Sequence, residues 1–141
     1  VVMIGKMPED TEIPENMICA GLVRDPVKLS EYYSMADVFL NPSVQETFGK
    51  TTAEAMSCGT PVIVYNTTAC TERVGQGCGK VVGNMEIPEY LSAVQEHLGK
   101  PKKSSVCRQF AENNFAYHDL CGKYMECISQ LYLAKKRRTG I

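Results

Sequence analysis

Residues 41–60 have the sequence NPSVQETFGKTTAEAMSCGT, and the predicted elements of this chain are arranged around them. They lie between two short apolar runs, DVFL at 37–40 and PVIVY at 61–65, whose length and composition are typical of β-strands. The compact segment 51–58 favours a helix, and Gly59 and Pro61 then predict the end of that helix and the start of the next strand. The stretch therefore predicts a binding loop that leads into a helix, within a β-loop-α-β unit.

Two carboxylates flank the start of this predicted helix. Glu46 precedes the helix, and Glu54, eight positions later, lies about one turn inside it. At a rise of about 1.5 Å per residue, this spacing predicts a separation of roughly 12 Å along the helix axis. The amides of residues 48–51 lie between the two carboxylates, and free amides at a helix start bind anions. A nucleotide sugar fits this arrangement, because it carries hydroxyls at both ends and a diphosphate between them.

The rest of the chain alternates strands with helices. Further strands are predicted at 1–4, 17–22 and 80–82. Asp25 and Pro26 predict the start of a helix that buries one face. The apolar positions of that helix are Leu29, Tyr32, Tyr33 and Ala36, with the tyrosines as core and rim. A helix that starts near Glu86 is predicted to line one face with Ile87, Leu91, Val94 and Leu98.

Two more helices close the predicted fold. Ser104 or Ser105 can cap the first, which carries Val106 and Phe110. The second runs from about residue 117 to 136, with an apolar face made of Leu120, Tyr124, Ile128 and Leu131. The alternation in the first half predicts an α/β fold with a Rossmann-like parallel sheet sandwiched by helices, and a helical C-terminal end.

The composition is that of one soluble globular domain. The chain has 141 residues, of which 44% are hydrophobic and 22% charged. No apolar run approaches transmembrane length and no signal peptide is recognisable. The seven cysteines include no C-x-x-C pair, which predicts reduced core residues in the cytosol rather than metal ligands. We therefore expect a cytoplasmic protein with no bound metal.

A basic cluster made of Lys135, Lys136, Arg137 and Arg138 ends the otherwise acidic chain, whose net charge is −1. We expect this cluster to be a solvated helix end that complements the negative end of the helix dipole. Contact with the inner face of a membrane is the less favoured alternative. No nucleic-acid partner is expected.

The residues around the central loop also resemble a known family. Segment 46–54 (ETFGKTTAE) and the following 55–62 (AMSCGTPV) are similar to the E-x7-E signature of the retaining glycosyltransferases of family 4, which have the GT-B fold. Three shorter segments before this signature also resemble the family and follow one another in the same order as in its donor-binding domain. They are AGLVR at 20–24, LSEYY at 29–33 and NPS at 41–43. The resemblance covers about residues 3–82, with a looser helical similarity to the end of the chain. It implies one half of a GT-B fold.

The resemblance implies a role for each site residue. Glu46, the catalytic candidate, would contact hydroxyls of the donor sugar, amides at 48–51 would meet the sugar and diphosphate, and Glu54 would hold the ribose hydroxyls. The donor-binding residues would be Val23, Arg24, Thr47, Phe48, Gly49, Lys50, Thr51 and Glu54. Arg24 would reach the base or a phosphate, or else be a solvated loop cation. Lys50 replaces the family's usual aliphatic residue, either as a cation near the phosphates or as a side chain in water.

The same resemblance implies a function. The chain would be the donor-binding half of a retaining hexosyltransferase that moves a sugar from a UDP- or GDP-linked donor to a saccharide or lipid-linked acceptor, for example in cell-surface polysaccharide synthesis. No cofactor is implied beyond this donor substrate. We expect residues 1–141 to be a single nucleotide-sugar-binding domain, a fragment of a two-domain enzyme. The N-terminal acceptor domain and the Arg and Lys that neutralise the diphosphate would precede Val1, so the fragment alone should be inactive.

Two other classes stay open. The first is a non-catalytic nucleotide-binding α/β module of the flavodoxin or receiver type. A receiver needs clustered acidic residues at strand ends, whereas Asp37 stands before its strand. The second is a sugar-nucleotide epimerase of the GT-B type. Such an epimerase would carry different residues in the donor loop, including a His that this loop lacks. Nucleotide titration distinguishes the first class from a glycosyltransferase, and product analysis distinguishes the second.

Overall fold

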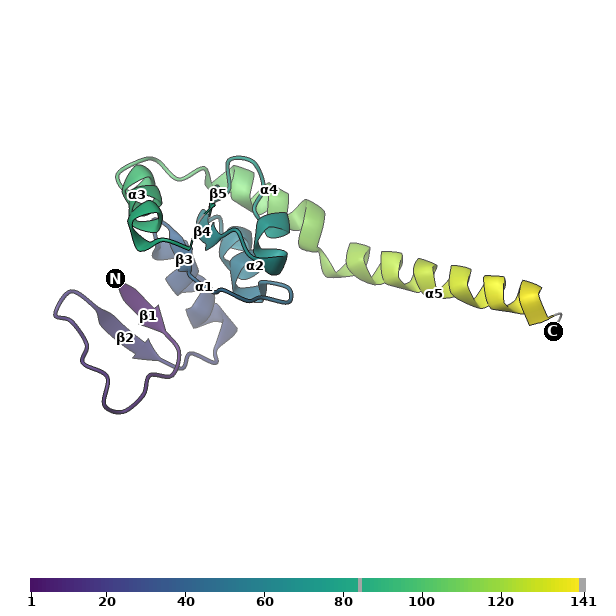
Figure 1. Ribbon diagram of the computed structural model, residues 1–141, viewed down its shortest axis with the longest axis horizontal. Coiled ribbons are helices and arrows are strands. Elements are labelled where there is room, and N and C mark those ends of the chain that lie inside the picture. The colour runs from purple at the N-terminus through teal and green to yellow at the C-terminus, as the bar shows by residue number, and fades with distance from the viewer. Residues whose placement is uncertain (84, 140–141) are drawn as a thin grey trace.

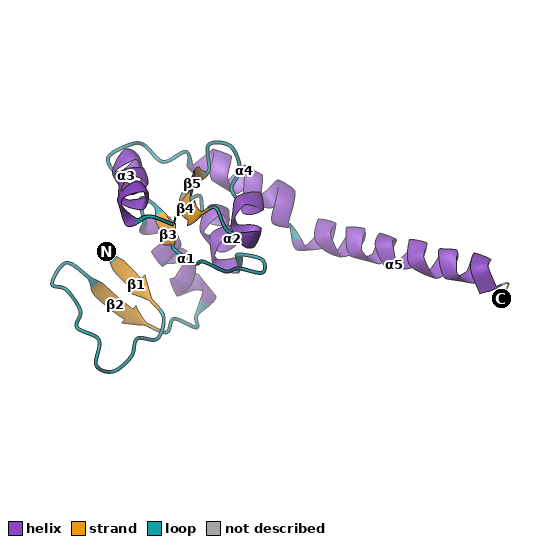
Figure 2. Ribbon diagram, in the orientation of Figure 1, coloured by secondary structure: helices purple, strands orange, loops and turns teal. Residues whose placement is uncertain are grey.

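Strand β4 (Val62–Tyr65) is the centre of the structure, and all four of its residues are buried. The computed structural model describes residues 1–83 and 85–139. The other strands are β1 (Val2–Ile4), β2 (Ile18–Gly21), β3 (Phe39–Asn41) and β5 (Gly79–Val82). The helices are α1 (Pro26–Met35), α2 (Lys50–Ser57), α3 (Ile87–His97), α4 (Ser104–Phe115) and α5 (Tyr117–Thr139), with a short 3-10 helix, η1 (Thr68–Arg73) (Figure 2).

Helices cover both faces of the sheet that contains β4 (Figure 1). Val62 and Val64 point to the side of α1, α2 and α4, where they pack in one apolar cluster with Met56 of α2. Ile63 and Tyr65 point to the opposite side, in a second cluster with residues of α3. Because successive side chains of a strand alternate between its faces, a continuous apolar run is what a strand buried on both sides requires. The predicted α/β fold with helices on both faces is confirmed.

The strands are all parallel, but they form two sheets. β3, β4 and β5 are paired in that order, with Phe39 opposite Val62 and Val62 opposite Gly79. β1 and β2 pair separately. The sequence predicted one sheet, since alternation of strands with helices indicates parallel pairing without fixing which strands are neighbours. Within the described residues, β1 and β3 each have a single neighbour.

Helix α1 begins as predicted. The carboxylate of Asp25 accepts a hydrogen bond from the backbone N–H of Val27 at 2.9 Å, and Pro26 occupies the first turn. Tyr33 is the buried residue of this helix. The ring of Tyr33 meets Phe39 of β3 edge to face, with centroids 5.4 Å apart. The predicted core role of Tyr33 is therefore confirmed.

The predicted apolar face of α3 is wrong for three of its four residues, whereas Val94 packs against the core as predicted. Ile87, Leu91 and Leu98 are all more than half exposed, and the helix instead buries Tyr90 and Ala93. The Tyr90 ring lies against Tyr65, and its hydroxyl donates to the carbonyl oxygen of Ile63 at 2.8 Å. A buried tyrosine usually finds a hydrogen-bond partner, so these contacts turn the Tyr90 side of α3 toward β4.

The predicted serine cap of α4 is also wrong. Lys103 is the N-cap and makes no capping hydrogen bond with its side chain, while Ser104 is already the first helical residue. Ser104 lies close to Gly59. A Cβ added to Gly59 would stand only 2.9 Å from the Ser104 Cβ. The start of α4 is thus placed by its contact with the turn after α2. Cys107 and Ala111 form its buried face.

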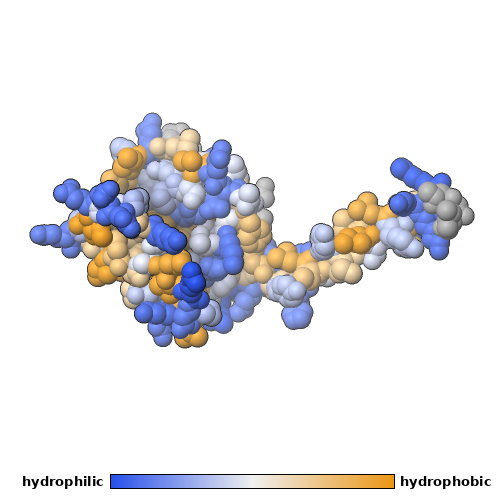
Figure 3. Space-filling model, turned by 90° about the horizontal axis from the view of Figure 1, so that it is seen from below, coloured by the Kyte–Doolittle hydropathy of each residue, from blue (hydrophilic) through white to orange (hydrophobic). Residues whose placement is uncertain are grey.

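Helix α5 projects from the body of the molecule (Figure 1), and apolar side chains are visible along it in Figure 3. Its predicted apolar positions Leu120, Tyr124, Ile128 and Leu131 are all exposed. Lys136, Arg137 and Arg138 lie in its last turn, where the basic cluster was predicted. In the described part of the chain, no helix has the length and apolar character needed to cross a membrane.

Three of the seven cysteines belong to the core, namely Cys70, Cys78 and Cys107. All seven are free thiols. Burial raises the pKa of the Cys107 thiol to about 12 and also raises the pKa of the Cys78 thiol. The core location predicted for the cysteines is wrong for Cys127, which is exposed on α5.

Candidate active site

Asn41 anchors the loop that follows β3. Its side chain is 5% exposed, and the Nδ2 amide donates to Thr52 Oγ1 at 3.1 Å. The same amide lies 3.5 Å from Glu46 Oε1, while Asn41 Oδ1 accepts from the backbone N–H of Ser43 at 3.2 Å. A buried amide needs such partners. One side chain therefore ties together the end of β3, the first turn of α2 and the Glu46 carboxylate.

The start of η1 holds the same loop from the other side. Thr68 Oγ1 accepts from the backbone N–H of Glu46 at 2.9 Å, and Thr67 Oγ1 donates to the carbonyl oxygen of Ser43 at 3.2 Å. Thr68 has a φ of 39°, which is uncommon for a β-branched residue and costs about 1–3 kcal/mol. The Thr68 contact fixes the backbone of Glu46, whose side chain is partly exposed, and the Thr67 contact fixes the loop three residues earlier.

Helix α2 begins with unpaired backbone donors. Its N-cap is Gly49, in the left-handed conformation at φ 71°, which glycine adopts at the lowest cost, and no side chain caps the helix. The first N–H groups of a helix have no partner within it. Those of Lys50, Thr51 and Thr52 can therefore donate to an anion, with the positive end of the helix dipole behind them.

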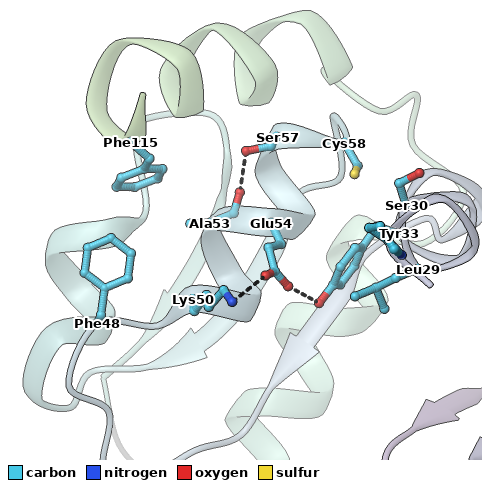
Figure 4. A pocket seen from close by; sticks show the side chains of 11 residues that line it. Leu29, Ser30, Tyr33, Phe48, Lys50, Ala53, Glu54, Ser57, Cys58 and Phe115 are labelled. Carbon is cyan, nitrogen blue, oxygen red and sulfur yellow. Dashed lines mark hydrogen bonds and ion pairs between the residues drawn. The ribbon is translucent and has the colours of Figure 1, made fainter. Parts of the chain in front are cut away.

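The carboxylate of Glu54 lies one turn inside α2. Its Oε2 accepts a hydrogen bond from the Tyr33 hydroxyl at 3.1 Å, and its Oε1 lies 3.7 Å from Lys50 Nζ (Figure 4). The Tyr33 hydroxyl has its pKa raised well above the usual range, by burial first and then by the Glu54 charge. Tyr33 therefore stays protonated at neutral pH and donates a hydrogen bond to Glu54.

A cavity of about 390 Å³ opens beside Glu54 (Figure 4). The lining residues are Pro26, Leu29, Ser30, Tyr33, Phe48, Lys50, Ala53, Glu54, Ser57, Cys58 and Phe115. The wall is mainly apolar, and the Glu54 carboxylate and Lys50 ammonium are its charged groups. Apolar pockets with a few convergent polar groups are typical of ligand sites.

The structure brings together some of the predicted site residues. Phe48, Lys50 and Glu54 line the cavity, and the Phe48 ring lies edge to face with Phe115, at a centroid distance of 6.1 Å. Thr47, Lys50 and Thr51 are exposed around the helix start. Val23 and Arg24 lie on the loop between β2 and α1 and do not line the cavity.

Glu46 also lies outside the cavity lining. The predicted spacing of 12 Å along one helix axis does not apply to this carboxylate. The helix starts at Lys50, so the path from Glu46 to Gly49 is loop rather than helix. The predicted order of the two carboxylates is confirmed: Glu46 precedes the helix start, and Glu54 lies one turn after it.

The sequence interpretation missed four contributors to the site: Tyr33 as the partner of Glu54, Asn41, Thr68 and Phe115. The helical spacing of Tyr33 predicted that it is buried. Nothing in the sequence predicted that its hydroxyl contacts Glu54. Asn41 and Thr68 act through side-chain contacts to the Glu46 loop. Phe115 comes from the end of α4, so no local pattern places it beside α2.

Comparison with known proteins identifies the family of this chain. Residues 1–99 match the family model described as glycosyl transferases group 1. An uncharacterised 41.2 kDa protein of the cps region of Klebsiella pneumoniae is 33% identical over 116 residues, which are 79% of this chain and 32% of that protein. A GDP-mannose-dependent alpha-(1-6)-phosphatidylinositol dimannoside mannosyltransferase of Mycobacterium tuberculosis is 33% identical over 84 residues, 59% of this chain and 22% of that protein.

Among solved structures, the crystal structure of Anabaena Alr3699/HepE in complex with UDP and glucose is similar in fold. The TM-score is 0.65 at 20% identity, and the match covers 82% of this chain and 33% of that one. The chain spans about a third or less of the length of these relatives. Since the family model covers well over half of its residues, the chain belongs to the glycosyl transferases of group 1.

Proposed function

We propose that this chain is the donor-binding part of a retaining glycosyltransferase of family 4, which uses a nucleotide diphosphate sugar. The observation that carries the proposal is the uncapped start of α2, with Glu46 on the loop before it and Glu54 one turn inside. Two similar proteins support the class of donor. The name of the Mycobacterium tuberculosis relative includes GDP-mannose, and the Anabaena structure contains UDP and glucose.

In this proposal, the diphosphate lies against the first amides of α2. The helix dipole and these N–H donors stabilise the negative charge that grows on the diphosphate as the sugar leaves. Glu54 accepts hydrogen bonds from the ribose hydroxyls at the cavity. Glu46, held at its backbone by Thr68 and beside Asn41, contacts hydroxyls of the sugar. Catalysis then consists mainly of positioning and charge stabilisation, with the departing diphosphate assisting the acceptor.

The acceptor side of the reaction lies outside these residues. We propose that residues 1–141 are a donor-binding domain of a two-domain enzyme, whose other domain binds a saccharide or lipid-linked acceptor. The relatives, about three or more times as long as the matched segment, support this division. Isolated residues 1–141 should therefore show no turnover.

The stereochemistry of the product tests the proposed function. The complete protein is incubated with UDP- and GDP-linked sugars and a suitable acceptor, and the anomeric configuration of the first product is read by proton NMR. We expect the configuration of the donor to be retained. Inversion of configuration, or epimerisation of the donor without transfer, would reject a retaining glycosyltransferase.

Replacing Glu54 by Gln is expected chiefly to raise the KM for the donor, by about 10-fold or more, because contacts to the ribose change little between ground and transition states. The measurement is steady-state kinetics of the complete protein with donor varied at saturating acceptor. Glu112→Gln, on the exposed side of α4, is the control and should behave as wild type. A fall in kcat with an unchanged KM would contradict the role given to Glu54.

A further inference from the structure

Tyr33 is fixed at both its ring and its backbone. The residue is 6% exposed, and its ring packs edge to face on Phe39. The carbonyl oxygen of Tyr33 accepts a hydrogen bond from the buried Thr60 hydroxyl at 2.5 Å. A side chain enclosed on both sides has little freedom to change rotamer. The Tyr33 hydroxyl is therefore held at one place on the wall of the cavity beside α2.

At that place the Tyr33 hydroxyl contacts the Glu54 carboxylate. The hydroxyl donates to Oε2 at 3.1 Å, across 21 positions of sequence, while the other oxygen, Oε1, faces Lys50 at 3.7 Å. The Lys50 side chain is 84% exposed, so water and salt screen its attraction to Glu54. A hydrogen bond from a buried donor to a charged acceptor is stronger and more directional. Of these two contacts, the Tyr33 hydroxyl is the one that orients the carboxylate.

We propose that Tyr33 is a positioning residue, whose hydroxyl holds one oxygen of Glu54 so that the carboxylate meets both vicinal hydroxyls of the donor ribose. The inference rests on the proposed function, since it assumes that Glu54 binds ribose. It adds that Tyr33, a core residue on α1, sets how strongly the site prefers a ribonucleotide to a nucleotide without the ribose hydroxyls. Lys50, the exposed partner, gives way to the incoming hydroxyls while Tyr33 keeps its contact.

A purely structural role for the Tyr33 hydroxyl makes a different prediction. Loss of a buried hydrogen bond that only supports packing weakens all nucleotides equally. Loss of the proposed orientation weakens only ligands that carry the ribose hydroxyls. Tyr90 provides the matched control, because it is also a buried tyrosine, with 7% exposure, and its hydroxyl donates to a backbone carbonyl of β4 and not to Glu54.

The experiment measures four dissociation constants for each variant and for the wild type, by calorimetry on the complete protein. The probes are UDP and GDP, each paired with its 2′,3′-dideoxy counterpart, and the quantity compared is the ratio of the two affinities in each pair. The variants are Tyr33→Phe, Glu54→Gln and Tyr90→Phe. In the wild type, the preferred ribonucleotide should bind about 10-fold or more tightly than its dideoxy form.

Tyr33→Phe should lower that ratio by about 3- to 10-fold while the affinity for the dideoxy form stays within about 2-fold, and Tyr90→Phe should leave the ratio unchanged. A Tyr33→Phe protein that keeps the wild-type ratio, or that weakens both ligands equally, overturns the inference. If Glu54→Gln lowers the ratio in that case, the proposed role of Glu54 survives. A wild type that binds neither UDP nor GDP, or does not distinguish the dideoxy forms, overturns the inference together with the proposed ribose contact of Glu54.

Discussion

Replacing Glu46 by Gln is expected to lower kcat by about 10- to 1000-fold with little change in the donor KM. The amide keeps the size of the side chain and its contact with Asn41, but it removes a negative charge beside a sugar ring that becomes positive as the bond to phosphate breaks. This stabilisation develops only in the transition state, so the loss falls on kcat. Steady-state kinetics of the complete protein with donor varied at saturating acceptor measures both constants.

Glu96→Gln is the control for Glu46→Gln. Glu96 is an exposed residue of α3 and pairs with Lys80 on the surface, so its replacement should leave both constants unchanged. If Glu46→Gln changes the donor KM alone, the carboxylate contributes to binding rather than to catalysis. In that case the roles assigned to Glu46 and Glu54 are wrong.

Replacing Gly79 by Ala should destabilise the fold by about 2–6 kcal/mol, which is a large part of the stability of an ordinary domain. Gly79 lies in β5 directly opposite Val62 and has a φ of 149°. An added Cβ would overlap the carbonyl oxygen of Val62, which is backbone at the centre of the sheet and cannot rotate away. Urea unfolding followed by circular dichroism gives the change in the free energy of unfolding.

Gly83→Ala is the matched control, because Gly83 follows β5 directly and has room for a methyl group. The nearest atom to its added Cβ is Glu89 Oε1, at 3.9 Å. Its unfolding free energy should lie within about 0.5 kcal/mol of the wild type. If Gly79→Ala unfolds at the same urea concentration as Gly83→Ala, the close pairing of β4 and β5 at Gly79 is incorrect.

Local patterns predicted the elements around the central loop well. The run that became β4 is short, apolar and bounded by Gly59 and Pro61, so several signals agree there. Gly59 also ends α2 as predicted, with a φ of 78° and its N–H bonded to the carbonyl oxygen of Met56 at 2.9 Å. Sequence reasoning succeeded where turn chemistry and apolar periodicity indicate the same boundary.

Predictions failed where a contact distant in sequence decides the structure. Apolar spacing placed Val94 of α3 on the core but missed Tyr90, whose hydroxyl reaches Ile63, 27 positions earlier. The same limit applied to the site. The order of Glu46 and Glu54 around the helix start was readable, but the contact of Glu54 with Tyr33 joins two helices. Such contacts depend on how helices pack, which local propensity does not determine.

A crystal structure of the complete protein with UDP or GDP bound is the direct test of the proposed donor site at the start of α2. We expect the diphosphate oxygens to accept hydrogen bonds from the backbone N–H groups at the start of α2, within about 3 Å. The ribose hydroxyls should donate to the Glu54 carboxylate, with Glu46 facing the position of the sugar. A nucleotide bound away from the start of α2, or one whose ribose lies at Glu46 rather than Glu54, would contradict the account.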